Sequence, residues 1–265
     1  MTIAYRFHGN RGMTVALLHG GPGALGSLLP LAEAMKGRFR LLEPFQRGSG
    51  GLPLSVQRHV EDFHELVTET CGGLPVAVVG HSWGAMLGLA VAAAYPGDVR
   101  SLVLVGCGTF DPASRLEMKK TLENRMGENV LEEIRALEGE TLDPGERMRR
   151  YVELTGRFYS FEPEGSWDPL SFDARAFEES WADMLRLQEE GVYPAAFSAI
   201  RCPVLMIHGA GDPHPGRMTR DLLGPFIPGL QYVELPECGH FPWMEKRARE
   251  KFLSLLSGWL ESRGA

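Results

Sequence analysis

The sequence lacks an excess of positive charge, which argues against one large class of partners. Lysine and arginine together number 27, against 34 aspartate and glutamate residues, and the formal net charge is −7 at pH 7. Nucleic-acid-binding proteins displace counterions from phosphates with clustered basic side chains. No such cluster occurs here, so we expect no nucleic-acid partner.

Long hydrophobic runs are also missing. No apolar run reaches the roughly 18 residues of a transmembrane helix, so we expect no membrane association. Residues 1–12 are polar, and they predict no signal peptide. The four cysteines form no Cys-x-x-Cys pair and have no histidine at metal-ligand spacing. Together with the lack of a Walker-type phosphate loop, these absences favour reduced thiols, a cytoplasmic location, no bound metal and no cofactor.

Continuous apolar runs that end in glycine-rich loops are what the sequence does contain. A strand that is apolar without alternation is buried on both faces, as in a parallel sheet covered by helices. Such runs alternate with helical stretches at 25–35, 55–70 and 85–95, which indicates an α/β fold. The expected strands of the sheet are residues 15–18, 39–45, 76–80, 101–106, 203–207 and 231–235.

The alternation stops at residue 109 and resumes at about residue 201. The segment 109–200 is rich in Glu, Arg, Leu and Met and shows no convincing strand, so we expect a helical cap inserted into a core of residues 1–108 and 201–265. Large aromatic side chains of the cap and of the core loops could form an apolar substrate pocket. The candidates are Phe45, Phe110, Trp167, Trp181 and Trp243.

A Gly-x-Ser-x-Gly arrangement stands between an expected strand and an expected helix. The residues are Gly80-His81-Ser82-Trp83-Gly84. A strand that turns directly into a helix holds its central residue in a strained conformation and exposes its hydroxyl, and glycine on either side permits close backbone approach. Ser82 is therefore the candidate nucleophile.

A serine nucleophile needs a histidine base, and the histidine needs an orienting acid. Asp212 follows the strand at 203–207, and His240 follows the strand at 231–235. The chain order Ser, Asp, His is the one expected for a serine on such a strand-to-helix turn. Asp111, after the strand at 101–106, is the competing acid.

Attack on a carbonyl creates an oxyanion that backbone N–H groups must already face. One donor should be the residue after the nucleophile, Trp83, and the other should lie in the loop after an earlier strand. The loop at 19–23, His-Gly-Gly-Pro-Gly, is in that place. We favour Gly21 as the second donor, with Gly20 as the alternative.

These motifs, with Gln-Arg-Gly-Ser-Gly at 46–50, resemble the α/β-hydrolase fold superfamily and, within it, the proline iminopeptidase-like (peptidase S33-like) group. The resemblance implies a mostly parallel sheet of the eight-stranded type, flanked by helices and carrying a helical cap. In that group an Asp commonly precedes the Gln-Arg-Gly turn, whereas this chain has Glu-Pro-Phe at 43–45. The group's cap also tends to be longer and supplies acids that hold the substrate's amine. The candidates here are Glu162, Glu164, Asp168, Glu178, Glu179 and Asp183.

The sequence thus predicts a serine hydrolase that cleaves a small carboxylic ester or amide through an acyl-enzyme. We favour carboxylesterase activity over the proline iminopeptidase-like aminopeptidase. Carbon–carbon bond hydrolysis with the same triad and a non-catalytic small-molecule receptor remain alternatives. The expected partner is the small-molecule substrate, and the chain would act as a monomer or homodimer.

Overall fold

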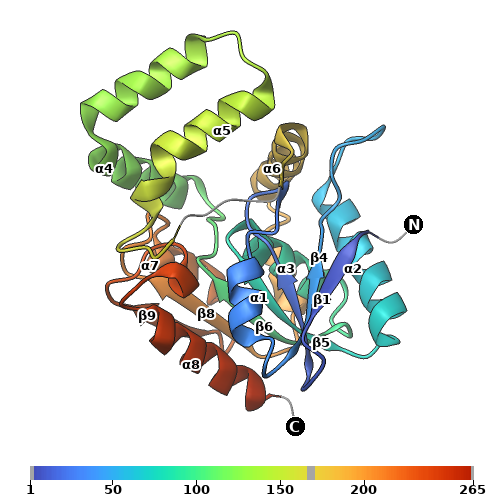
Figure 1. The fold of residues 1–265 in the computed structure, drawn as a ribbon. Helices are drawn as coiled ribbons and strands as arrows, with labels where there is room; N and C mark the ends of the chain where they lie inside the picture. Colours follow the sequence, from blue (N-terminus) through green and yellow to red (C-terminus); the bar gives the residue numbers. More distant parts are fainter. Residues whose placement is uncertain (1–2, 166–170, 264–265) are drawn as a thin grey trace.

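A seven-stranded sheet runs through the centre of the molecule (Figure 1). The computed structural model describes residues 3–165 and 171–263. The spatial order is β1-β4-β2-β5-β6-β8-β9, with β1 antiparallel to β4 and all other neighbours parallel. The strands are β1 (Tyr5–His8), β2 (Thr14–Leu18), β4 (Arg40–Pro44), β5 (Val76–His81), β6 (Val99–Val105), β8 (Val204–Gly209) and β9 (Gln231–Leu235). The expected mostly parallel sheet is confirmed, with seven strands in the described residues instead of eight.

Helices cover both faces of the sheet, because its central strands are apolar on both sides. In β2, Val15 and Leu17 join one hydrophobic cluster, and Ala16 and Leu18 join the cluster on the opposite face. The first cluster includes side chains of α1 (Leu29–Met35) and α8 (Arg249–Glu261). The second includes side chains of α2 (Val56–Cys71), α3 (Trp83–Ala94) and α7 (Gly216–Leu223).

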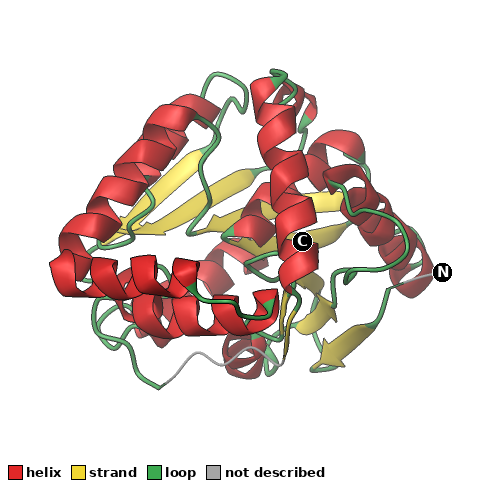
Figure 2. Cartoon of the chain, turned by 90° about the horizontal axis from the view of Figure 1, so that it is seen from above, coloured by secondary structure: helices red, strands yellow, loops and turns green. Residues whose placement is uncertain are grey.

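The segment between β6 and β8 is mainly helical and lies over the edge of the sheet where the parallel strands end (Figures 1 and 2). It comprises α4 (Pro112–Gly139), α5 (Pro144–Thr155), the 3₁₀ turn η1 (Gly156–Tyr159), β7 (Ser171–Phe172), α6 (Ala174–Glu189) and η2 (Ala195–Ala199). The long helix α4 is interrupted at Gly127, whose φ of 70° is not helical. In Figure 1, α4 and α5 form the yellow-green projection above the sheet.

Two details differ from the sequence expectation. The helix expected from residue 25 begins at Leu29, because Ala24–Leu25 (β3) pairs with β7 in a small antiparallel sheet. The segment 109–200 therefore does contain a strand, which corrects the expectation of none. A pairing of two residues is too short to produce an alternating pattern.

No described helix is long and apolar enough to cross a membrane. A final 3₁₀ turn, η3 (Pro242–Met244), precedes α8.

Candidate active site

Ser82 stands on the sharp turn between β5 and α3. Its φ of 53° and ψ of −117° lie outside the regions that side-chain-bearing residues usually adopt. Its backbone N–H donates to the carbonyl oxygen of Val105 at 2.9 Å, which ties the turn to β6. A Cβ on Gly80 would lie 2.2 Å from the carbonyl oxygen of Gly84, and one on Gly84 would lie 2.0 Å from that of Leu18. Both glycines of the motif are therefore required by close backbone packing.

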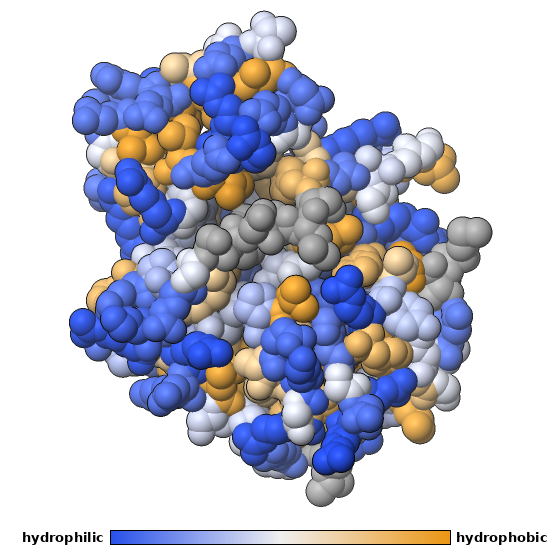
Figure 3. Space-filling view, viewed as in Figure 1, coloured by the Kyte–Doolittle hydropathy of each residue, from blue (hydrophilic) through white to orange (hydrophobic). Residues whose placement is uncertain are grey.

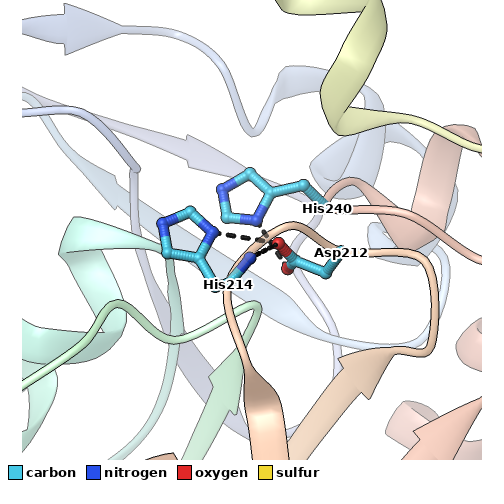
Figure 4. A group of neighbouring side chains, drawn as sticks. All are labelled: Asp212, His214 and His240. Carbon is cyan, nitrogen blue, oxygen red and sulfur yellow. Dashed lines mark hydrogen bonds and ion pairs between the residues drawn. The ribbon is translucent and has the colours of Figure 1, made fainter. Parts of the chain in front are cut away.

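Asp212 and His240 approach each other from the loops after β8 and β9. The Nδ1 of His240 lies 2.7 Å from the Oδ2 of Asp212, and both side chains are buried (Figure 4). His240 lines the same cavity as Ser82. The alternative acid, Asp111, is instead the N-cap of α4, where its carboxylate accepts from the N–H of Ser114 at 2.9 Å. The structure thus brings Ser82, Asp212 and His240 to one site and places Asp111 in a capping role.

Three imidazoles surround the Asp212 carboxylate. Its Oδ2 faces His240 and, at 3.3 Å, the Nε2 of His208, while its Oδ1 accepts from both the backbone N–H and the Nδ1 of His214 at 2.9 Å. Burial opposes ionisation, but the three rings hold the pKa of Asp212 well below its usual value. An ionised carboxylate only accepts hydrogen bonds, so His240 carries a hydrogen on Nδ1 and its Nε2 is unprotonated when the ring is neutral.

Burial lowers the pKa of His240, although Asp212 acts in the opposite direction. The ring of His214 stacks on that of His240, with centroids 4.6 Å apart and 21° between planes. On another side, His81 lies 4.6 Å from His240 by ring centroids, and its Nε2 donates to the His240 carbonyl oxygen at 2.9 Å. Burial keeps the pKa of His81 well below the usual value, so this ring is neutral. Neither contact follows from sequence spacing, because loops that meet only in the fold bring these rings together.

Asp212, His214 and His240 also lie close enough together to be a candidate metal-binding group. One oxygen and two ring nitrogens from these residues lie within 4.8 Å of one another. In the structure the two ring nitrogens hydrogen-bond to the carboxylate (Figure 4). The sequence expectation of no metal rested on spacing along the chain, which does not detect His214 as a neighbour of this pair.

The loop after β2 lies against Ser82. A Cβ on Gly20 would be 3.2 Å from the Cβ of Ser82, and Gly20 and Gly21 both line the cavity. Gly21 has a φ of 44°. Trp83 opens α3, and first-turn N–H groups have no acceptor within their own helix. Among the described residues, no backbone–backbone hydrogen bond outside the helices and strands has the N–H of Gly21 or Trp83 as its donor.

A mostly apolar cavity of about 490 Å³ opens above Ser82. This volume is in the range of small-molecule sites. Hydrophobic residues gather on the inner side of α4 and α5 in Figure 3. The large apolar side chains of the lining include Met148, Tyr151, Val152, Phe172, Phe177, Phe241 and Met244. Most of these come from the segment 109–200, the others from the loop after His240.

Four of the five aromatic side chains expected over Ser82 lie elsewhere. Phe110 packs edge-on against Phe197, and Trp181 packs against Trp83. Two more candidates are Trp243, which is buried between His81 and Phe252, and Phe45, which lies beneath the guanidinium of Arg6. None of these four lines the cavity, because each is used in packing within or beside the core. The fifth candidate, Trp167, lies outside the described residues.

Of the acidic residues considered for an amine site, the five that the structure describes do not line the cavity either. Glu162 pairs with Lys246 and Arg247 on the surface. Glu179 accepts from the Leu54 N–H, and Asp183 accepts from the Val56 N–H. Glu164 and Glu178 are exposed and absent from the lining, and Asp168 lies outside the described residues. One other acid, Glu153, borders the cavity, and its exposed carboxylate pairs with Arg149.

The mostly parallel sheet, the strand-to-helix turn at Ser82 and the contact between Asp212 and His240 are features of α/β hydrolases. The chain belongs to the alpha/beta hydrolase family, whose model matches residues 15–253. It is 28% identical over 238 residues to RutD of Klebsiella pneumoniae (strain 342), to which carbamate hydrolase activity is ascribed, with 86% of this chain and 85% of that one covered.

A proline iminopeptidase of Heyndrickxia coagulans is 23% identical, with 97% of this chain and 94% of that one covered. Among solved structures, a thermophilic esterase from Thermogutta terrifontis matches with a TM-score of 0.66 at 20% identity, covering 99% and 94% of the two chains. The proline iminopeptidase of Mycobacterium smegmatis matches with a TM-score of 0.67 at 21% identity, covering 98% and 94%. The sequence resemblance to the α/β-hydrolase superfamily, including its iminopeptidase-like members, is confirmed.

Proposed function

We propose that this α/β hydrolase is a serine carboxylesterase that cleaves small esters with an apolar group. The observation that carries the proposal is the 2.7 Å contact between His240 and Asp212 beside a strained Ser82, at the floor of an apolar cavity. Relatives named as esterases support it, among them the pimeloyl-[acyl-carrier protein] methyl ester esterase of Nitrosomonas europaea, at 23% identity.

In the proposed mechanism, the Oγ of Ser82 attacks the ester carbonyl while the Nε2 of His240 accepts the serine proton. Asp212 holds the hydrogen of His240 on Nδ1 and stabilises the imidazolium. The N–H groups of Trp83 and Gly21 bind the oxyanion of the tetrahedral intermediate. His240 then protonates the departing alcohol, and a water molecule activated by the same histidine releases the acid.

The lining of the cavity favours esters over aminoacyl substrates. An aminopeptidase must hold a protonated amine, and a buried carboxylate is the usual partner for such a cation. Glu153 is the acid of the described lining, and Arg149 already neutralises it at the surface. An apolar acyl or alkyl group fits the remaining wall better than a charged one.

We further propose that residues 109–200 act as a cap over a core of residues 1–108 and 201–265. This segment supplies most of the apolar wall, so it would determine which ester enters. We also propose that the protein is cytoplasmic and acts as a monomer or homodimer. It would have no nucleic-acid or membrane partner. The four free cysteines, two of them buried, agree with a reducing compartment.

The test compares p-nitrophenyl esters of increasing acyl length with aminoacyl p-nitroanilides, including that of proline. We expect turnover of the esters alone, and a loss of about 10⁴–10⁶ in kcat for Ser82→Ala. A fluorophosphonate should label Ser82. Cleavage of the anilides alone would indicate an aminopeptidase, and tight ligand binding without any turnover would indicate a receptor.

A further inference from the structure

A buried polar network connects the two loops that carry the proposed oxyanion donors. The side chain of Gln46, only 5% exposed, lies between the loop after β2 and the start of α3. Its Nε2 donates to the carbonyl oxygen of His19 at 3.1 Å, and its Oε1 accepts from the indole Nε1 of Trp83 at 2.8 Å. An indole N–H can only donate and a carbonyl can only accept, so the orientation of the amide is fixed.

The imidazole of His19 extends this network to the next peptide. Full burial lowers the pKa of His19 to about 4, so the ring is neutral at pH 7. Its Nε2 faces the backbone N–H of Gln46 at 3.4 Å, and it can accept that hydrogen bond only when unprotonated. The ring hydrogen is then on Nδ1, which donates to the carbonyl oxygen of Gly20 at 3.0 Å.

The hydrogen bond from His19 sets the direction of one proposed oxyanion donor. In a planar trans peptide, the carbonyl oxygen of one residue and the N–H of the next point in opposite directions. Because His19 holds the Gly20 carbonyl toward its ring, the Gly21 N–H points away from the ring. Gly21 lines the cavity together with Ser82. His19 therefore fixes the orientation of the peptide that carries the proposed Gly21 donor.

We propose that Gln46 is a positioning residue of the oxyanion hole. Its hydrogen bonds to His19 and from Trp83 hold the two segments that carry the proposed N–H donors at a fixed distance from each other. This inference rests on the proposed esterase function. Gln46 is not part of the cavity lining, so it acts through its two neighbours and not on substrate. One side chain thereby links the loop of Gly21 to the start of α3 at Trp83, although the two proposed donors are more than sixty residues apart in the chain.

The test uses Gln46→Met, which keeps the length of the side chain but forms neither hydrogen bond, and Trp83→Phe, which removes the indole donor while retaining the backbone N–H. Each variant is assayed for kcat, KM and the Ki of an alkylboronic acid, whose serine adduct is tetrahedral and anionic. We expect kcat to fall about 10–100-fold, less than for outright loss of an oxyanion donor. Boronate Ki should rise by a similar factor, with KM changed less than about twofold.

A matched control is Ser180→Ala. The Ser180 hydroxyl bonds His59 at 2.8 Å, and the His59 ring packs edge-on against Trp83, so this change removes an equally buried hydrogen bond beside the same indole. It should leave kcat and boronate Ki unchanged. In the double variant Gln46→Met/Trp83→Phe, kcat should fall little further than in the worse single variant, because both changes break one network.

Unchanged boronate affinity and kcat in folded Gln46→Met would overturn the inference while leaving the esterase proposal intact. Full turnover in Ser82→Ala would overturn the esterase proposal itself. Should Gln46→Met not fold, Gln46→Glu tests the same point, because it retains the acceptor for Trp83 but cannot donate to His19 when ionised. Its boronate Ki must then rise if the inference holds, and an unchanged Ki refutes it.

Discussion

Replacing Glu245 should weaken both the stability of the protein and the placement of His240. This carboxylate is fully buried, and it accepts three backbone N–H groups from two separate segments. Its Oε1 binds the N–H groups of Phe161 and Gly239 at 2.9 Å each, and its Oε2 binds that of Glu162 at 2.7 Å. The loop that carries His240 is thereby fastened to residues 161–162 of the segment that covers the cavity.

The size of the effect can be worked out for Glu245→Gln. A neutral amide has one oxygen. Two of the N–H groups therefore exchange a charged acceptor for a neutral one, and the third loses its hydrogen bond because it faces an NH₂ group. Hydrogen bonds to charged groups contribute about 1.5–3 kcal/mol against about 0.5–1.5 kcal/mol for neutral ones, so two weakened bonds and one lost bond give a loss of roughly 4–6 kcal/mol. For a chain of this length that corresponds to a decrease in Tm of roughly 8–12 °C.

Differential scanning calorimetry and ester kinetics on the same preparations provide the assay. Besides the lower Tm, kcat should fall about tenfold while KM changes less, since a looser His240 affects proton transfer more than binding. Glu162→Gln is the matched control. Its side chain pairs with Lys246 and Arg247 in solvent, so its Tm should not change measurably. A Glu245→Gln protein with the Tm and kcat of the parent would refute the reasoning.

Two further results are expected. The acid limb of kcat/KM should have its midpoint below pH 6.5, because burial lowers the pKa of His240 and the neutral ring is the active base; a pH profile from 4 to 9 measures this, and a midpoint above 7 would contradict it. Met148→Trp should fill part of the cavity and reduce kcat/KM for long-chain p-nitrophenyl esters more than for the acetate ester; an unchanged chain-length profile would place the acyl group elsewhere.

The parallel sheet and the meeting of Ser82, Asp212 and His240 could be predicted from the sequence, because each residue lies at or shortly after the end of an expected strand. The carboxyl ends of parallel strands share one edge of a sheet, so position along the chain translates into proximity. The helix expected at residues 55–70 is present as α2, and the Ser55 hydroxyl caps it by accepting from the Arg58 N–H at 3.1 Å. Local chemistry determines features of this kind.

The cavity wall could not be read in the same way. Helical periodicity shows that α5 has an apolar face, but not that this face meets Phe241 and Met244 across the cavity. The tryptophans that composition suggested for the wall satisfy packing elsewhere, as with Trp181 against Trp83. The contact of His214 with His240 could not be predicted, because it depends on the approach of two loops whose histidines are 26 residues apart in the chain.

The segment that covers the cavity also bears on the proposed base. The backbone N–H of His240 donates to the carbonyl oxygen of Tyr159 at 2.7 Å, and the Tyr159 side chain is in ring contact with His240 while both residues line the cavity. Selectivity for substrate and placement of His240 therefore depend on the same few residues. Substitutions near Tyr159 made to change substrate preference should alter kcat even for substrates that do not touch them. Substitutions on α5, one turn or more away, can change preference with less effect on His240.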